Sequence, residues 1–86
     1  MMRYELRRTS EANPAAFEAI GETDDLQDAL SHAEVGKAWR AMDGDFDTEF
    51  QVWDNEKKAY AFNGLTQYIR CDRSVNKNAP YEVRDV

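Results

Sequence analysis

Residues 43–50, with the sequence DGDFDTEF, place acidic side chains at the alternating spacing that a calcium-binding loop uses. If the first aspartate is position one of such a loop, Asp45, Asp47 and Asp54 fall at positions three, five and twelve. Thr48, however, occupies position six, where the loop needs glycine, and position twelve holds aspartate instead of the longer bidentate glutamate. The sequence therefore predicts a turn at the Asp-Gly pair followed by a strand, and no functional calcium site.

No other residues have the types and spacing of a catalytic or cofactor site. Cys71 is the only cysteine, so an internal disulfide cannot form and a structural zinc site would lack its usual thiolates. His32 is the only histidine, and its place in a predicted helix favours a plain surface or boundary role. Each of the four glycines stands alone beside a predicted turn or cap, unlike a phosphate-binding loop. We therefore predict that the chain is not an enzyme and that it binds no cofactor or metal.

Acidic residues are concentrated in one part of the chain. The formal net charge is −6, and residues 11–36 contain seven acidic side chains and no basic one, whereas residues 1–10 sum to +2. Such a surface repels phosphate backbones and anionic lipids and attracts basic proteins by electrostatic steering. We expect a protein partner with a basic surface, no direct binding of nucleic acid and no membrane association. The candidate partner-binding residues are Glu22, Asp24, Asp25, Asp28 and Glu34.

The element expected to carry most of these acids is a helix that begins near residue 23. Thr23 or Asp24 can act as its N-cap, and Gln27 follows Asp24 at the spacing of a capping box. Apolar residues then recur at i, i+3, i+4 and i+7, which predicts one helix face packed on a sheet. This apolar stripe consists of Leu26, Ala29, Leu30 and Ala33.

The predicted end of this helix is Gly36. In a continued straight helix, Val35, Trp39 and Met42 would lie on the side opposite the apolar stripe, so the periodic pattern is broken there. A glycine just past the last periodic residue supplies a left-handed C-cap conformation without steric cost. Residues 37–42 are consistent with either a short strand or a last helical turn.

Alternation of apolar and polar residues predicts the strands. A strand covers residues 2–8, and a short second strand is expected over 17–22, although residues 15–20 could equally form one helical turn. After the helix, Asp-Gly and Asn-Gly turn signals separate segments that form an antiparallel meander with one solvent-exposed face, on which Asp47 and Glu49 lie. These segments are 46–53, 59–62 and 65–71.

The predicted fold class is α+β, with one antiparallel sheet of four to five strands, including a meander after the helix, packed by one main α-helix. Residues 1–86 are predicted to form a single small domain. The tail from about residue 72 is polar up to Pro80 and is expected to be loosely ordered, with residues 81–84 as a candidate edge strand.

Two functions from different classes follow from size and charge. The first is a small acidic binding protein that inhibits a nucleic-acid-binding protein or complex, by analogy with anti-restriction and anti-CRISPR proteins of phages and mobile elements. The alternative is a structural or oligomeric accessory domain that forms a homodimer through a sheet edge or an aromatic patch containing Trp39 and Trp53. A lone cysteine, and the lack of an apolar leader or a run of about 18 apolar residues, predict a soluble cytoplasmic protein.

Overall fold

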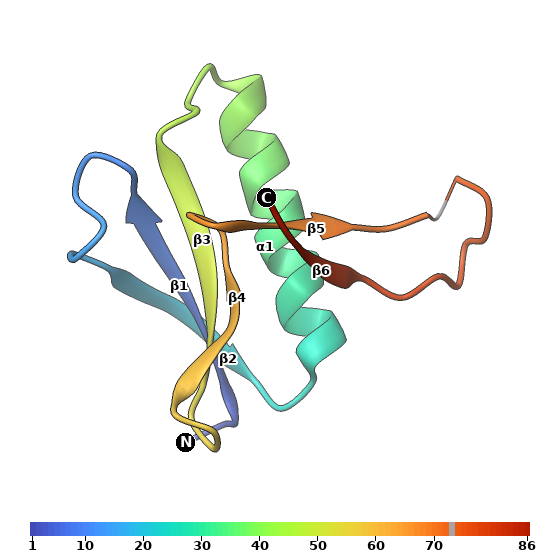
Figure 1. The fold of residues 1–86 in the computed structure, drawn as a ribbon, viewed down its shortest axis with the longest axis horizontal. Coiled ribbons are helices and arrows are strands. Elements are labelled where there is room, and N and C mark those ends of the chain that lie inside the picture. The colour runs from blue at the N-terminus through green and yellow to red at the C-terminus, as the bar shows by residue number, and fades with distance from the viewer. Residues whose placement is uncertain (73) are drawn as a thin grey trace.

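The computed structural model describes residues 1–72 and 74–86, which form one helix and six strands. Four strands make an antiparallel sheet in the order β2-β1-β3-β4, and β5 and β6 pair as a second, two-stranded sheet (Figure 1). The predicted α+β class, with one main helix packed on an antiparallel sheet, is confirmed. The elements are β1 (Tyr4–Ser10), β2 (Glu18–Thr23), α1 (Leu26–Met42), β3 (Thr48–Asp54), β4 (Ala59–Asn63), β5 (Gln67–Arg70) and β6 (Glu82–Asp85).

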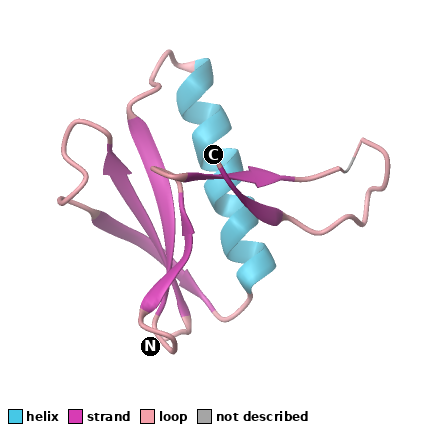
Figure 2. Cartoon of the chain, viewed as in Figure 1, coloured by secondary structure: helices cyan, strands magenta, loops and turns pink. Residues whose placement is uncertain are grey.

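Helix α1 lies along one face of the four-stranded sheet, and this contact forms the core (Figure 2). Leu30 of α1 and Val52 of β3 are the largest side chains that are fully buried. The predicted apolar stripe does face the sheet, with Leu26 partly buried at its start. The buried core consists of Tyr4, Leu6, Ala29, Leu30, Ala33, Phe50, Val52 and Phe62.

The predicted helix end at Gly36 is wrong, because α1 continues to Met42 and residues 37–42 are helical. Gly36 instead marks a close approach between α1 and the sheet. A β-carbon built on it would lie 2.8 Å from Cζ of Phe50, so only glycine lets the helix pass at this distance. The Asp43-Gly44 pair, expected to turn a hairpin, ends the helix: Asp43 is its C-cap, and Gly44 takes the left-handed conformation with φ +80°.

The start of α1 differs from the prediction by one or two residues. Asp25 is the N-cap, and its carboxylate accepts a hydrogen bond from the Gln27 backbone N–H at 2.9 Å. The Gln27 side chain does not close a capping box, because it pairs with the backbone of Tyr81. Its amide nitrogen donates to the Tyr81 carbonyl at 3.0 Å, and its oxygen accepts from the Tyr81 N–H at 2.7 Å. This pair fastens the C-terminal segment to the helix.

Strand β5 leaves the main sheet instead of extending the predicted meander. Gly64 makes the turn after β4, and a β-carbon there would lie 2.5 Å from the Phe50 carbonyl oxygen, so the turn passes directly over β3. Beyond it, β5 and β6 form a hairpin that points away from the four-stranded sheet (Figure 1). The candidate edge strand near the C-terminus is therefore β6, which pairs with β5. Ala79, in the loop before β6, is buried.

Strand β3 is buried on both faces, which corrects the expectation that Glu49 lies in solvent. Glu49 and Gln51 are 7% and 3% exposed, because β1 and β4 flank β3 and neighbouring side chains cover its second face. The Glu49 carboxylate forms an ion pair with Lys37 of α1, and the Gln51 amide donates to the Asn63 side chain at 3.1 Å. Phe46, expected in the strand and on its core face, precedes β3 and is exposed.

We expect Gly36→Ala to destabilise the protein although alanine is the better helix former. Alanine gains about 0.8–1.0 kcal/mol of helix propensity over glycine, but its methyl group must displace the Phe50 ring, and such overpacking costs about 1–3 kcal/mol. Denaturant unfolding should show a net loss of up to about 2 kcal/mol. Gly21→Ala is the control, because nothing lies within 4 Å of a β-carbon built there. An increase in stability for Gly36→Ala would contradict the close packing of Gly36 on Phe50.

A second prediction concerns acid stability. Hydrogen bonds from the Arg3 guanidinium, at 3.3 and 3.2 Å, hold the pKa of the nearly buried Asp54 carboxyl below its usual value. In the unfolded chain the pKa of an aspartate is about 3.9. Because the pKa of Asp54 is lower in the folded protein, its ionised carboxylate stabilises the fold above that pH, and this stabilisation is lost as the pH falls. The stability difference between the parent and Asp54→Asn should therefore shrink between about pH 5 and pH 2. Glu11→Gln, an exposed control, should show no such trend; an equal trend in both variants would contradict the assignment.

Candidate functional site

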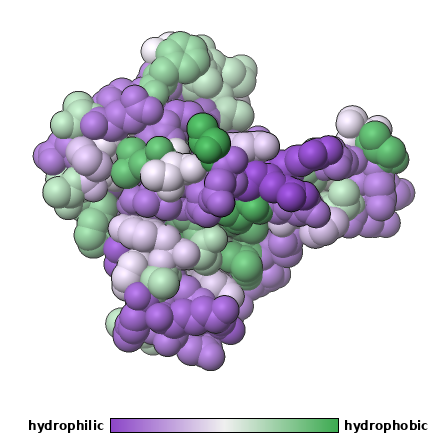
Figure 3. All heavy atoms as spheres, in the orientation of Figure 1, coloured by the Kyte–Doolittle hydropathy of each residue, from purple (hydrophilic) through white to green (hydrophobic). Residues whose placement is uncertain are grey.

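The outer face of α1 carries an apolar stripe that the core does not use. Val35, Trp39 and Met42 recur at i, i+4 and i+7 on the side away from Leu30, and they are 47%, 62% and 76% exposed. We call these three residues the outer stripe. Moderately apolar surface, pale green in Figure 3, gathers at the end of the molecule where α1 ends and the loop to β3 begins. Exposed apolar side chains grouped in this way are typical of a docking surface.

Three of the predicted partner-binding acids lie together at the N-terminal end of the same helix. Asp24 and Asp25 precede the first turn, and Asp28 lies two helical turns before Val35 on the same face. Glu22 is on the neighbouring strand β2, opposite Glu5 of β1. The structure therefore groups the aspartates with the outer stripe and places Glu22 on the sheet beside them.

Two of these aspartates also stabilise the fold. Asp24 accepts a hydrogen bond from the Arg3 backbone N–H at 2.8 Å, and Asp25 caps α1. Asp28 lies 3.9 Å from the ring of His32, which is exposed as predicted. Within residues 1–72 and 74–86, none of the three forms an ion pair with a lysine or arginine side chain, so no basic side chain neutralises their charge.

Glu34 is separated from the other acids by the helix itself. It lines a cleft of about 380 Å³ between α1 and β5, together with the apolar side chains of Phe50, Phe62 and Ile69. Partial burial raises the pKa of the Glu34 carboxyl. Lys37, at the same cleft, is held by the Glu49 carboxylate and by the Thr48 carbonyl.

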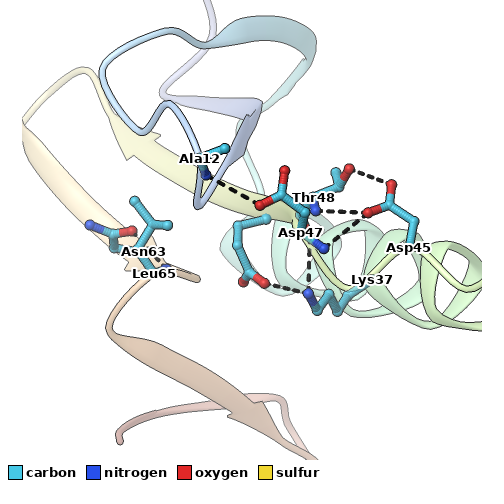
Figure 4. Close-up of polar contacts among 8 residues, drawn as sticks. Ala12, Lys37, Asp45, Asp47, Thr48, Asn63 and Leu65 are labelled. Carbon is cyan, nitrogen blue, oxygen red and sulfur yellow. Dashed lines mark hydrogen bonds and ion pairs between the residues drawn. The ribbon is translucent and has the colours of Figure 1, made fainter.

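The aspartates of the stretch 43–50 are held in hydrogen bonds of their own (Figure 4). The Asp45 carboxylate accepts from the hydroxyl and the N–H of Thr48 and from the Asp47 N–H, and these bonds lower its pKa. Asp47 points to the other side and accepts from the Ala12 N–H at 3.2 Å. The two carboxylates thus diverge instead of converging on one point, as ligands of a cation would.

The face of the sheet opposite α1 carries an aromatic cluster around Arg7. Its guanidinium carbon lies 4.0 Å from the ring centre of Phe17 and 4.8 Å from that of Trp53, and its Nε donates to Glu5 at 2.6 Å. Trp53 also makes an edge-to-face contact with Tyr60, with ring centres 5.0 Å apart. Because Trp53 faces away from α1, the sheet separates it from Trp39, and the patch expected to contain both tryptophans is not formed.

Comparison with known proteins finds no match to this chain among protein-family models, curated proteins or solved structures. In the described part of the chain, no three His, Cys, Asp or Glu side chains gather closely enough to hold a metal ion. No helix there combines the length and apolar character needed to cross a membrane. The surfaces themselves are therefore the basis for a functional proposal.

We expect calcium to leave the protein unchanged. The Asp45 and Asp47 carboxylates would have to break their hydrogen bonds and turn toward each other before they could share a cation. Thermal unfolding with and without calcium should give the same midpoint, and calorimetric titration should detect no binding tighter than about 10⁻⁵ M. A midpoint shift that disappears in Asp47→Asn would contradict this prediction.

Proposed function

We propose that this chain is a non-enzymatic binding protein that docks the outer face of α1 on a basic surface of another protein. The observation that carries the proposal is the exposure of Trp39, at 62%, within an apolar stripe. Aspartates that form no ion pair with a lysine or arginine side chain lie at one end of the same helix face. Tryptophan is the residue most enriched among interface hot spots, and a charged rim around such an anchor is common.

The charge of this face defines the chemistry of the partner. Asp24, Asp25 and Asp28 add negative charge at the positive end of the helix dipole, and Asp43 follows at the other end of α1. A basic surface with an apolar pocket for the Trp39 ring would complement both features. Acidic rim residues of this kind mainly accelerate association, whereas the buried aromatic anchor slows dissociation.

Proteins that bind nucleic acid carry basic surfaces that contact phosphates, which favours an inhibitor of a nucleic-acid-binding protein or complex. The chain would then occupy a groove built for phosphate, as anti-restriction and anti-CRISPR proteins do. The net charge of −6 and the small size support this class by analogy. The single unpaired cysteine, Cys71, is consistent with a role in the cytoplasm.

The proposal predicts that capture of a basic partner depends on Trp39. Immobilised parent protein and Trp39→Ser would be exposed to lysate of the native host, and retained proteins would be quantified by mass spectrometry. We expect at least one protein with a basic surface to be retained by the parent and reduced about tenfold or more by Trp39→Ser. Phe17→Ser, an exposed aromatic residue on the other side of the sheet, is the matched control. If no basic protein depends on Trp39, the proposal fails.

The acidic rim gives a separate prediction. Replacing Asp24, Asp25 and Asp28 together by asparagine should preserve the helix, because asparagine still caps it and none of the three lies on the buried stripe. Association with the captured partner should slow, and the affinity should depend less steeply on salt. Circular dichroism would confirm the helix, and binding kinetics would be measured at two salt concentrations. Unchanged rates and salt dependence would limit these aspartates to capping and solubility.

A further inference from the structure

We propose that the cleft between α1 and β5 binds a small molecule that carries a protonated amine on an apolar, aromatic body. We call this space, of about 380 Å³, the α1–β5 cleft. The inference is independent of the proposed function, because the cleft lies on a different side of α1 from the outer stripe. It also concerns a free small molecule instead of a protein.

The α1–β5 cleft exists because β5 runs across the direction of α1 instead of alongside it (Figure 1). Gly64 directs the chain out of the main sheet over β3, and Ile69 of β5 then packs against the core. Tyr68, the residue before it, is 50% exposed and also lines the cleft. The volume falls within the range of about 300–1,000 Å³ that small-molecule sites occupy.

The floor of the α1–β5 cleft is apolar and held in place by the core. Phe50 and Phe62 line the cleft although they are only 6% and 5% exposed. The Phe50 ring also lies against Gly36 of the helix, so it has little room to move. An aromatic body that enters the cleft removes water from these rings and gains ring–ring contacts, which favours an aromatic ligand over a purely polar one.

The charged side chains of the α1–β5 cleft leave one carboxylate without a cation. Lys37 follows Glu34 by three residues, a spacing at which two side chains on a helix can pair. Lys37 is instead held by the Glu49 carboxylate and the Thr48 carbonyl. Among the described residues, Glu34 forms no ion pair, and partial burial raises the pKa of its carboxyl. The cleft therefore keeps one uncompensated negative charge beside an apolar floor.

This charge arrangement selects an amine over an acid. A protonated amine would supply the cation that Glu34 lacks, and charge-assisted hydrogen bonds of this kind are stronger than neutral ones. In the described part of the chain, Oε2 of Glu49 accepts no hydrogen bond, and it lies 3.1 Å from a β-carbon built on Gly64, at the cleft wall. It is a second acceptor for the amine. A ligand carboxylate would meet repulsion from Glu34, and Lys37 is already paired.

Titration of the isotope-labelled protein with phenethylamine, followed by NMR, tests the inference. Backbone amide signals of residues 33–37 and 67–69 should shift in a saturable way, with a dissociation constant of about 1 mM or tighter. Phenethyl alcohol keeps the ring and lacks the charge, and phenylacetate reverses the charge. Both should bind about tenfold more weakly or worse. Butylamine, which resembles a lysine side chain of a protein, lacks the ring and should be weakened to a similar extent.

Glu34→Gln removes the selecting charge and nearly preserves the size of the side chain. Because the Glu34 side chain reaches solvent, the fold should survive, and circular dichroism would confirm this. The affinity for phenethylamine should fall about tenfold, whereas the weak binding of phenethyl alcohol should not change. Glu22→Gln is the matched control, because Glu22 is an exposed glutamate on β2, outside the cleft, and its replacement should leave the affinity unchanged.

Four results would each overturn the inference. The first is the lack of any saturable shift with phenethylamine up to about 10 mM. The second is a set of shifts confined to residues that do not line the cleft. The third is equal binding of phenethyl alcohol or butylamine, which would show that the charge or the ring selects nothing. The fourth is unchanged phenethylamine affinity in Glu34→Gln. None of these results bears on capture of a protein partner through Trp39, which is not part of the cleft.

Discussion

The contact of Phe50 with two glycines is the constraint on which the arrangement of this protein depends. Its ring lies against Gly36, which sets the distance between α1 and the sheet, and its carbonyl accepts from the Gly64 N–H at 2.9 Å. The first contact lets the helix run on to Met42, so that an outer stripe exists at all. The second directs the chain out of the sheet after β4, which leaves β4 as an edge. One residue, through its ring and its backbone carbonyl, thereby makes both contacts.

Sequence patterns predicted the strands and the buried stripe of α1 because those features repeat locally. They failed at Gly36, where a close approach between distant segments looks the same as a helix end. The same observation contained the missed site: Val35, Trp39 and Met42 lie opposite the buried stripe. The change of side from the buried stripe to these residues predicted the end of the helix. In the structure the helix continues, and these residues form an exposed apolar face.

The sequence showed that the acidic residues are concentrated in one part of the chain, but it did not show that they lie on different sides of α1. The acids fall close together in sequence, yet the helix separates Glu34 from Asp28, because residues six apart lie on different sides of α1. The aromatic cluster around Arg7 was not predictable in the same way. Alternation along β1 places Arg7 on the face away from the core, but its neighbours Trp53 and Tyr60 come from β3 and β4. Their proximity depends on the strand order, which is a long-range property.

The two candidate surfaces lie on opposite sides of one layered molecule, and they differ in physical character. The outer face of α1 combines an exposed tryptophan with unpaired aspartates, so salt should weaken its contacts with a basic partner by screening them. The aromatic cluster around Arg7 is neutral at its centre, because the Arg7 guanidinium pairs with the Glu5 carboxylate. Rising ionic strength should thus weaken contacts at the outer face of α1 more than contacts at the neutral cluster.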